Sequence, residues 1–286
     1  MSQSYIRIDH NYQGVAGAIA SYLLPGPELT LIEAGPASTT PTLLSNIRAA
    51  GFDPAAITRL VVTHIHLDHA GAAGVLLLRH LPHARLFVHP KGAKHLIDPS
   101  KLIASAERIY GDQMQTLWGE IVPVPEDRVV IVADQDMIGG LRAIDTPGHA
   151  VHHHSYYDAS SGTIFTGDVA GVRLDATRYV RPPTPPPELD LDAWAASVER
   201  LRRLRPRRLC LTHFGEFDDV TWHLDDLMTR LSAWRDWLST DLSPRTLEER
   251  EAGLLSPELA ARYERVGTYQ ACVDGFARYF AKRAAA

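Results

Sequence analysis

The stretch Thr63-His64-Ile65-His66-Leu67-Asp68-His69 carries more chemistry than any other part of this 286-residue chain. It follows a short apolar run that predicts a buried strand, and it precedes a run with helical spacing. His64 and His66 are two residues apart, so an extended backbone places their side chains on one side, whereas Asp68 and His69 follow as the chain turns. One strand-to-helix loop can therefore supply ligands to two metal ions. Imidazole and carboxylate ligands suit zinc, iron, manganese or nickel.

Three later positions have the character needed to complete such a site, since one loop cannot fill two coordination spheres. His149 ends a Thr-Pro-Gly-His segment, Asp168 ends Thr-Gly-Asp and His213 ends Thr-His. Each follows an apolar run that predicts a strand, and the loops at the ends of strands converge on a site. Alone, each has an ordinary interpretation as a loop histidine, a helix cap or a surface residue. Together with the first loop they make seven ligands: His64, His66, Asp68, His69, His149, Asp168 and His213.

The rest of the chain predicts a mixed α/β architecture. Short β-rich runs alternate with helical runs over the first two thirds, and the residues from Asp218 onward recur with helical spacing. We therefore expect an α/β domain over 1–217 and a helical C-terminal extension over 218–286 that packs on it. This packing is expected to depend on three tryptophans of the extension: Trp222, Trp234 and Trp237.

The composition excludes several classes of function. The chain has 45% hydrophobic and 22% charged residues, which is typical of a globular protein, and its net charge of −5 favours neither nucleic acid nor an anionic membrane as partner. Cys210 and Cys272 form no CxxC pair, so we expect no disulfide and a cytoplasmic location. No run approaches the roughly 20 apolar residues of a transmembrane helix. The apolar run 15–24 lacks the preceding basic cluster of a secretory signal and predicts a strand.

The motifs HxHxDH, Thr-Pro-Gly-His, Thr-Gly-Asp and Thr-His, in this order and rough spacing, resemble those of the metallo-β-lactamase-fold hydrolase superfamily. The resemblance covers about residues 5–215 and implies an αββα sandwich, in which two mixed β-sheets pack together with helices outside. It is specific for the fold and poorly specific for the substrate. The ligands that it implies form two groups and a bridge: His64, His66 and His149 for the first metal, Asp68, His69 and His213 for the second, and Asp168 between them.

Some branches of the superfamily resemble this chain less well. The main di-zinc β-lactamases carry a Cys ligand, whereas Cys210 lies in an expected buried strand. The flavin-linked di-iron members have Glu at the position of His66. Nucleases bring basic surfaces that a net charge of −5 does not support. Glyoxalase II is similar in its first half, but the C-terminal helices here lack its basic glutathione-binding cluster.

The resemblance implies an enzyme that binds two divalent ions, for which we expect zinc, with iron or manganese as the alternatives. The ions would hold a bridging hydroxide that attacks the carbonyl of an ester, thioester or lactone, and Asp68 would orient the water and shuttle a proton. Three alternatives stay open: an iron-dependent persulfide-type oxygenase, a phosphodiesterase on the same metal core, and a non-catalytic binding protein. A small-molecule substrate is the expected partner, and a homo-oligomer stays open.

Residues outside the ligand set have weaker signals. Tyr179 lies past the Asp168 loop and is a candidate donor of a hydrogen bond to a substrate carbonyl. The segment 181–187 contains five prolines and predicts an extended loop, either a stiff connector or a pocket wall. The resemblance makes His153 a candidate support for the ligands. Other histidines have no motif support and are expected to be structural or on the surface: His10, His80, His83, His89, His95, His152, His154 and His223.

Overall fold

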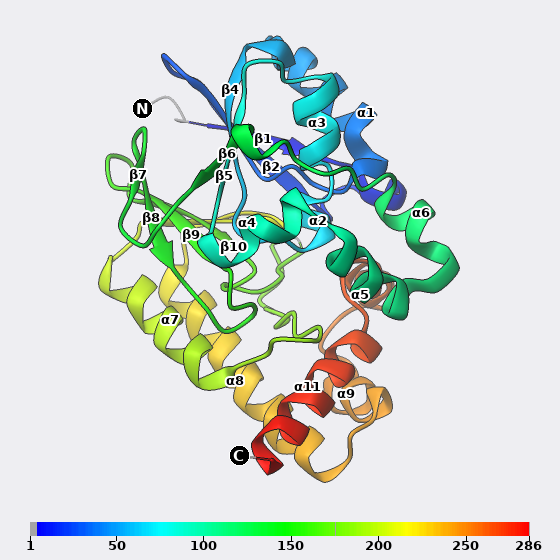
Figure 1. Cartoon of the computed structure of the whole chain (residues 1–286). Helices are drawn as coiled ribbons and strands as arrows, with labels where there is room; N and C mark the ends of the chain where they lie inside the picture. The colour runs from blue at the N-terminus through cyan, green and yellow to red at the C-terminus, as the bar shows by residue number, and fades with distance from the viewer. Residues whose placement is uncertain (1–4, 175, 286) are drawn as a thin grey trace.

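Two six-stranded mixed sheets lie face to face in the computed structural model, which describes residues 5–174 and 176–285 (Figure 1). In the first sheet β1–β3 are antiparallel and β3–β6 are parallel. Its strands stand in chain order: β1 (Ile6–Asp9), β2 (Ala20–Leu24), β3 (Leu29–Ile32), β4 (Ile57–Val61), β5 (Arg85–Val88) and β6 (Val129–Ile131).

The second sheet is antiparallel except for the parallel pair β10 and β11. Its strands also stand in chain order: β7 (Met137–Ile138), β8 (Leu141–Asp145), β9 (His154–Asp158), β10 (Thr163–Gly167), β11 (Arg208–Leu211) and β12 (Gly215–Phe217). Parallel pairing needs a crossover, and α7 (Leu191–Arg203) supplies it between β10 and β11.

Helices cover the outer faces of both sheets, which confirms the expected αββα sandwich (Figure 1). Those of the first half are α1 (Thr40–Ala49), α2 (Leu67–Ala70), α3 (Ala73–Arg79), α4 (Pro90–Ile97), α5 (Ser100–Tyr110) and α6 (Met114–Trp118). After α7 come α8 (Val220–Thr240), α9 (Pro244–Glu251), α10 (Pro257–Val266) and α11 (Tyr269–Ala284). None of these helices is both long and apolar enough to cross a membrane.

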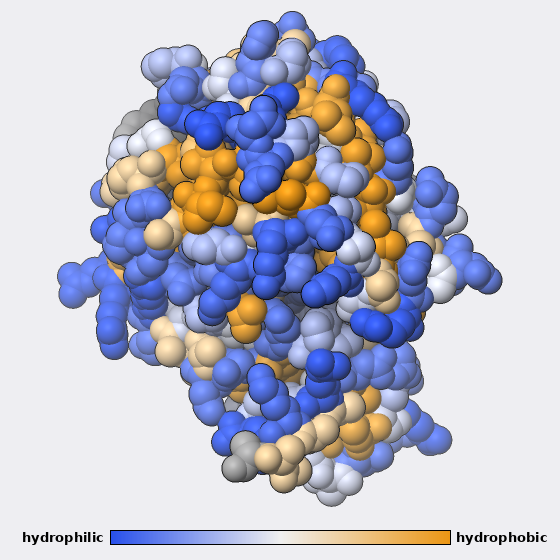
Figure 2. Space-filling model, in the orientation of Figure 1, coloured by the Kyte–Doolittle hydropathy of each residue, from blue (hydrophilic) through white to orange (hydrophobic). Residues whose placement is uncertain are grey.

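The period of two along each strand explains the layers. On β4, Leu60 packs under the helices of the first half, while Val61 faces the other sheet. On β10, Ile164 packs under the C-terminal helices, while Phe165 points between the sheets. The centroids of the Phe165 and Tyr22 rings lie 5.2 Å apart. Each sheet therefore buries both of its faces. Figure 2 shows an apolar area on the half that holds the first sheet and a mostly hydrophilic surface around it.

The C-terminal helices share a core with the second sheet. Leu209 of β11 and Trp234 of α8 belong to one apolar cluster, and both side chains are fully buried. We expected the packing to depend on all three tryptophans, but Trp222 and Trp237 are only half-buried. The helical extension after Asp218 is thus present, with Trp234 as its central residue.

Several elements differ from the sequence-based expectation. Helical spacing in the sequence predicts one helix over 99–118, but the structure has two, α5 and α6, because Gly111 takes a φ of +49° after α5. The helix expected from Gly71 is preceded by the one-turn α2. The sequence did not reveal β1, β7, α4 or β12, of which β7 has only two residues.

Candidate metal centre

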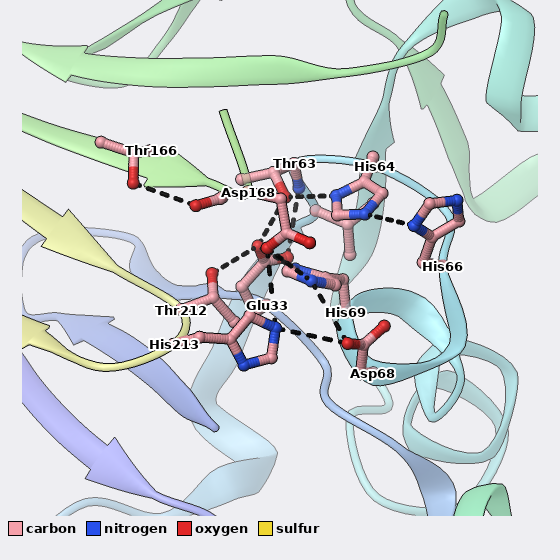
Figure 3. Close-up of polar contacts among 12 residues, drawn as sticks. Glu33, Thr63, His64, His66, Asp68, His69, Thr166, Asp168, Thr212 and His213 are labelled. Atoms are coloured by element: carbon pink, nitrogen blue, oxygen red, sulfur yellow. Dashed lines mark hydrogen bonds and ion pairs between the residues drawn. The ribbon is translucent and has the colours of Figure 1, made fainter. Parts of the chain in front are cut away.

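The seven predicted ligands lie together at the edge of the sandwich where β4, β8, β10 and β11 end. Figure 3 labels all of them except His149. His64 and His66 stand in the loop after β4, and Asp68 and His69 follow in α2. Three overlapping groups have ligand atoms within 4.8 Å of one another: His64, His66 and His149; His64, His69 and Asp168; and Asp68, His69 and His213.

The first group is made of three imidazoles that face one point. His66 Nδ1 lies 2.9 Å from His64 Nε2 and also 2.9 Å from His149 Nε2. His149 reaches this position through Gly148, whose φ is +138° and whose backbone leaves no room for a side chain. A Cβ there would lie 2.3 Å from Trp194 Cα, so only glycine fits between the loop and α7.

Asp68, His69 and His213 form the second group of candidate ligands, and Asp168 connects this group to the first. His213 Nε2 lies 3.3 Å from Asp68 Oδ2, and His69 Nε2 lies 3.7 Å from the same oxygen. Asp168 Oδ1 lies 3.2 Å from His69 Nε2, while its Oδ2 lies 3.3 Å from His149 Nε2. The two oxygens of Asp168 thus face different groups, which is the placement expected of a bridging carboxylate.

Hydrogen bonds fix the histidine tautomers so that bare nitrogens face the centre. His149 Nδ1 lies 2.8 Å from the Pro183 carbonyl and His213 Nδ1 lies 2.8 Å from the Ala18 carbonyl. A carbonyl only accepts, so each Nδ1 donates and each Nε2 keeps a lone pair. His69 Nδ1 donates in the same way to Glu33, at 2.9 Å.

His64 is fixed by a longer chain of donors. The Thr63 hydroxyl donates to Glu33 Oε1 at 2.6 Å, so it accepts from His64 Nδ1 at 3.0 Å. His64 Nε2 is then bare. Among the described residues, His69 Nε2 and Asp168 Oδ1 are buried without a hydrogen-bond partner. Buried polar atoms without partners are rare, and here they face convergent lone pairs. This donor set fits divalent metal ions held by imidazole and carboxylate.

Electrostatics divide the histidines into two sets in the metal-free chain. Burial lowers the pKa of His66 to about 3 and holds the pKa of His64 well below its usual value, with neighbouring histidines adding to the effect. Burial opposes the charged forms of His69 and His213 too, but Asp168 and Asp68 raise the pKa of both rings. The carboxylates of Asp68 and Asp168 thus favour a proton on His69 and His213 in the metal-free chain, and a metal ion would take the place of such a proton.

The comparisons agree with this geometry. The family model described as "Metallo-beta-lactamase superfamily" matches residues 14–213. The chain belongs to the metallo-beta-lactamase superfamily. It is 32% identical over 163 residues to the metallo-beta-lactamase fold-containing protein ST1585 of Sulfurisphaera tokodaii. The aligned residues make up 54% of this chain and 60% of that protein. The crystal structure of ST1585 superposes with a TM-score of 0.71 at 23% identity, over 96% of this chain and 99% of that chain, which shows the shared fold.

Two named hydrolases match shorter segments. The N-acyl homoserine lactonase AttM of Agrobacterium fabrum is 31% identical over 114 residues, 40% of each chain. A hydroxyacylglutathione hydrolase of a Chelativorans strain is 30% identical over 126 residues, 44% of this chain and 38% of that protein. The chain therefore matches from 38% to 60% of the length of these curated relatives. Metallo-beta-lactamase superfamily members are mostly metal-dependent hydrolases.

Tyr179 lies away from these ligands, contrary to the expectation that it faces a substrate. Its side chain is buried, and its hydroxyl donates to Glu251 at the end of α9. The Arg230 guanidinium stacks on its ring, with Cζ 4.1 Å from the ring centroid. The Tyr179 proton is thus committed to a buried carboxylate in the helical extension, and we remove this residue from the candidate site. Sequence proximity to Asp168 was misleading because the chain leaves the site within a few residues.

His153 supports Asp168 rather than joining the candidate ligands. Its Nε2 accepts a hydrogen bond from the Asp168 backbone N–H at 3.1 Å, and its Nδ1 lies 2.8 Å from the Thr146 hydroxyl. The ring is fully buried. The Pro-rich segment 181–187 contacts the site through the Pro183 carbonyl that holds His149. These contacts position Asp168 and His149 before any metal is bound.

Glu33 is the site residue that the sequence analysis missed. Its buried carboxylate accepts from the Thr63 hydroxyl, from His69 Nδ1 and, at 3.1 Å, from the Thr212 hydroxyl. It follows β3 with a φ of +68°, a strained conformation for a side chain with a Cβ. The only signal was a lone carboxylate at the end of an apolar strand, which is common without function. Glu33 orients ligands of both groups.

Replacing Glu33 by Gln is expected to weaken metal binding about 10- to 100-fold, which is the usual cost of losing the hydrogen-bond partner of a metal ligand. The amide keeps the size of the side chain, but its NH2 group must face either the three donors at Oε1 or the Thr63 backbone N–H, which donates to Oε2 at 3.2 Å. Competition with a chromophoric chelator measures the affinity for Zn²⁺. Glu28→Gln, at the exposed end of the same strand, is the matched control. Equal affinities in the two variants would contradict a positioning role for Glu33.

Proposed function

We propose that this chain is a dinuclear metal-dependent hydrolase that acts on the carbonyl of a small, partly apolar ester, thioester or lactone. One observation carries the proposal. The Nε2 lone pairs of His64, His149, His69 and His213 converge around Asp168, each fixed by an acceptor at the opposite ring nitrogen. Two divalent ions, for which zinc suits the donors, would be held by His64, His66 and His149 and by Asp68, His69 and His213, with Asp168 between them.

When bound, the ions would lower the pKa of water toward about 7 and polarise a carbonyl oxygen. The chain itself must then place the water and move its proton, and Asp68 is suited to both. Although burial opposes its ionisation, His69 and His213 lower the pKa of Asp68 to about 2. Its side chain is 19% exposed, whereas that of Asp168 is 4% exposed. Asp68 is thus an ionised acceptor that solvent reaches, able to orient a water and pass its proton to a leaving group.

The named relatives favour carbonyl chemistry. The lactonase and the hydroxyacylglutathione hydrolase both act on acyl compounds, as their names state. The net charge of −5 offers little attraction to polyanions. These features support a neutral or weakly charged acyl substrate.

A panel of an aryl ester, a lactone and a bis-aryl phosphodiester tests the substrate class on one zinc-loaded sample. The ester or the lactone is expected to turn over faster than the phosphodiester, and a chelator-stripped sample provides the background rate. Efficient cleavage of the phosphodiester with no ester or lactone turnover would replace the proposal by the phosphodiesterase alternative. Oxygen consumption with an iron-loaded sample and a persulfide would replace it by the oxygenase alternative.

A further inference from the structure

A second cluster of metal-binding side chains lies outside the seven ligands. His89, Asp145 and His154 offer ligand atoms that all lie within 4.8 Å of one another. The two histidine rings have centroids 4.5 Å apart and both are buried. Neither residue contributes to the candidate centre, and the sequence analysis assigned both a structural or surface role.

The fold brings these residues together from both sheets. Asp145 is the last residue of β8 and His154 is the first residue of β9, and the two face each other in the register of this antiparallel pair. His89 directly follows β5 of the first sheet and precedes α4. The cluster therefore joins the ends of two strands of one sheet to the end of a strand of the other.

Polar side-chain atoms of Asp145 and His154 lack hydrogen-bond partners. Within residues 5–174 and 176–285, Asp145 Oδ1 and both ring nitrogens of His154 are buried without a hydrogen bond. His89 Nε2 lies 3.2 Å and His154 Nε2 lies 4.0 Å from Asp145 Oδ1. The neighbouring carboxylate of Asp134 is already paired with Arg200 at 2.7 Å. Leaving both nitrogens of a buried imidazole unpaired is costly, and a shared cation would bind one ring nitrogen of His154 together with Asp145 Oδ1.

We propose that His89, Asp145 and His154 form a mononuclear site for a divalent ion of the zinc class, separate from the candidate centre. Two imidazoles and one carboxylate are a known zinc donor set that leaves a fourth position to water. The Asp145 side chain is 38% exposed, which gives the ion a path from solvent.

Binding requires a change of tautomer at His89. Its Nδ1 accepts from the Lys91 backbone N–H at 3.0 Å, so the neutral ring carries its proton on Nε2, toward Asp145. An ion bound at Nε2 requires that proton on Nδ1. The Nδ1–H and the Lys91 N–H are then both donors and cannot bond to each other, so each needs water as its partner in the exposed first turn of α4. No proton is gained or lost, and one capping hydrogen bond is exchanged for a metal bond.

The site would stabilise the loop that serves the candidate centre. Residues 146–153 connect Asp145 to His154, and this loop carries both His149 and the supporting His153. An ion that binds both ends of the loop and the end of β5 would fix its base. The proposed role is therefore structural, and it does not depend on the reaction that the chain catalyses.

Equilibrium dialysis of the full-length chain against buffered Zn²⁺, followed by elemental analysis, tests the proposal. Asp145→Asn is expected to contain one zinc fewer per chain than the wild type. Asp127→Asn, which changes an exposed carboxylate outside the cluster, is expected to match the wild type. Because only the difference is counted, the result does not depend on how many ions the candidate centre holds.

Zinc-edge anomalous diffraction from wild-type crystals locates the ion directly and needs no variant. A peak between His89, Asp145 and His154 is the expected result, and His154→Leu should remove it. Equal zinc content in the wild type and Asp145→Asn, or a map with peaks only at the candidate centre, would overturn the proposal.

Discussion

Asp168→Ala is expected to lower ester hydrolysis about 10³-fold or more, a loss of about 4 kcal/mol of transition-state stabilisation. It should be worse than any single histidine substitution among the ligands. Asp168 is the residue whose two oxygens face both groups, at 3.2 Å from His69 and 3.3 Å from His149. Its loss should therefore reduce occupancy at both metal positions, whereas loss of His66 removes a ligand from one group.

Metal content and turnover measured on the same samples check this ranking. Asp127→Ala, an exposed carboxylate substitution, controls for the change in charge. Thermal unfolding of the metal-free proteins controls for folding, because Asp168 is buried. Wild-type activity in Asp168→Ala would remove this residue from the site, and a normal metal content with low activity would show that it does not bridge.

Deleting residues 219–286 is expected to give insoluble protein. The deletion would expose the apolar residues of the second sheet that now pack against α8 and α11, among them Ile164 and Leu209. Exposed apolar areas of this kind promote aggregation. The soluble fraction after expression, compared with that of the full-length chain, is the measurement. A soluble, folded and metal-loaded truncation would contradict the prediction and show that residues 1–218 fold without the helical extension.

A graded version of the same experiment uses single substitutions in α8. Trp234→Ala should cost about 3–5 kcal/mol, as is usual for a large buried side chain. Trp237→Ala, in the same helix but half-buried, should cost clearly less. Urea unfolding of the metal-free proteins gives both values. Equal losses would mean that the tryptophans contribute alike, as the spacing in the sequence had indicated.

Local patterns in the sequence predicted a mixed α/β domain and the clustering of the seven candidate ligands, and the resemblance of the motifs to the superfamily added the αββα sandwich. His64, His66, Asp68 and His69 share one loop, and the other ligands each follow an apolar run. The position of Glu33 was not predictable in this way. Its partners are distant in sequence: the pairing of β3 with β4 brings it behind Thr63 and His69, and the packing of the two sheets brings it to Thr212, which follows β11.

Tyr179 and His89 are two further residues whose contacts could not be predicted from the sequence. Tyr179 follows Asp168 closely in sequence, but its hydroxyl bonds Glu251, which is 72 residues away. His89 had no motif, yet the two sheets place it beside Asp145 and His154. Contacts made between sheets or with the C-terminal helices follow from tertiary packing, which spacing along one strand does not encode.

Adding Zn²⁺ back to chelator-stripped protein while following aryl-ester or lactone hydrolysis tests the central claim most directly. Our account predicts no turnover without metal, a rise on addition of Zn²⁺ and a plateau once two equivalents occupy the candidate centre. The Asp145→Asn background keeps the second cluster from taking up zinc during the titration. Full hydrolysis by the stripped protein, or a plateau at one equivalent with no further gain, would contradict a dinuclear metal-dependent hydrolase.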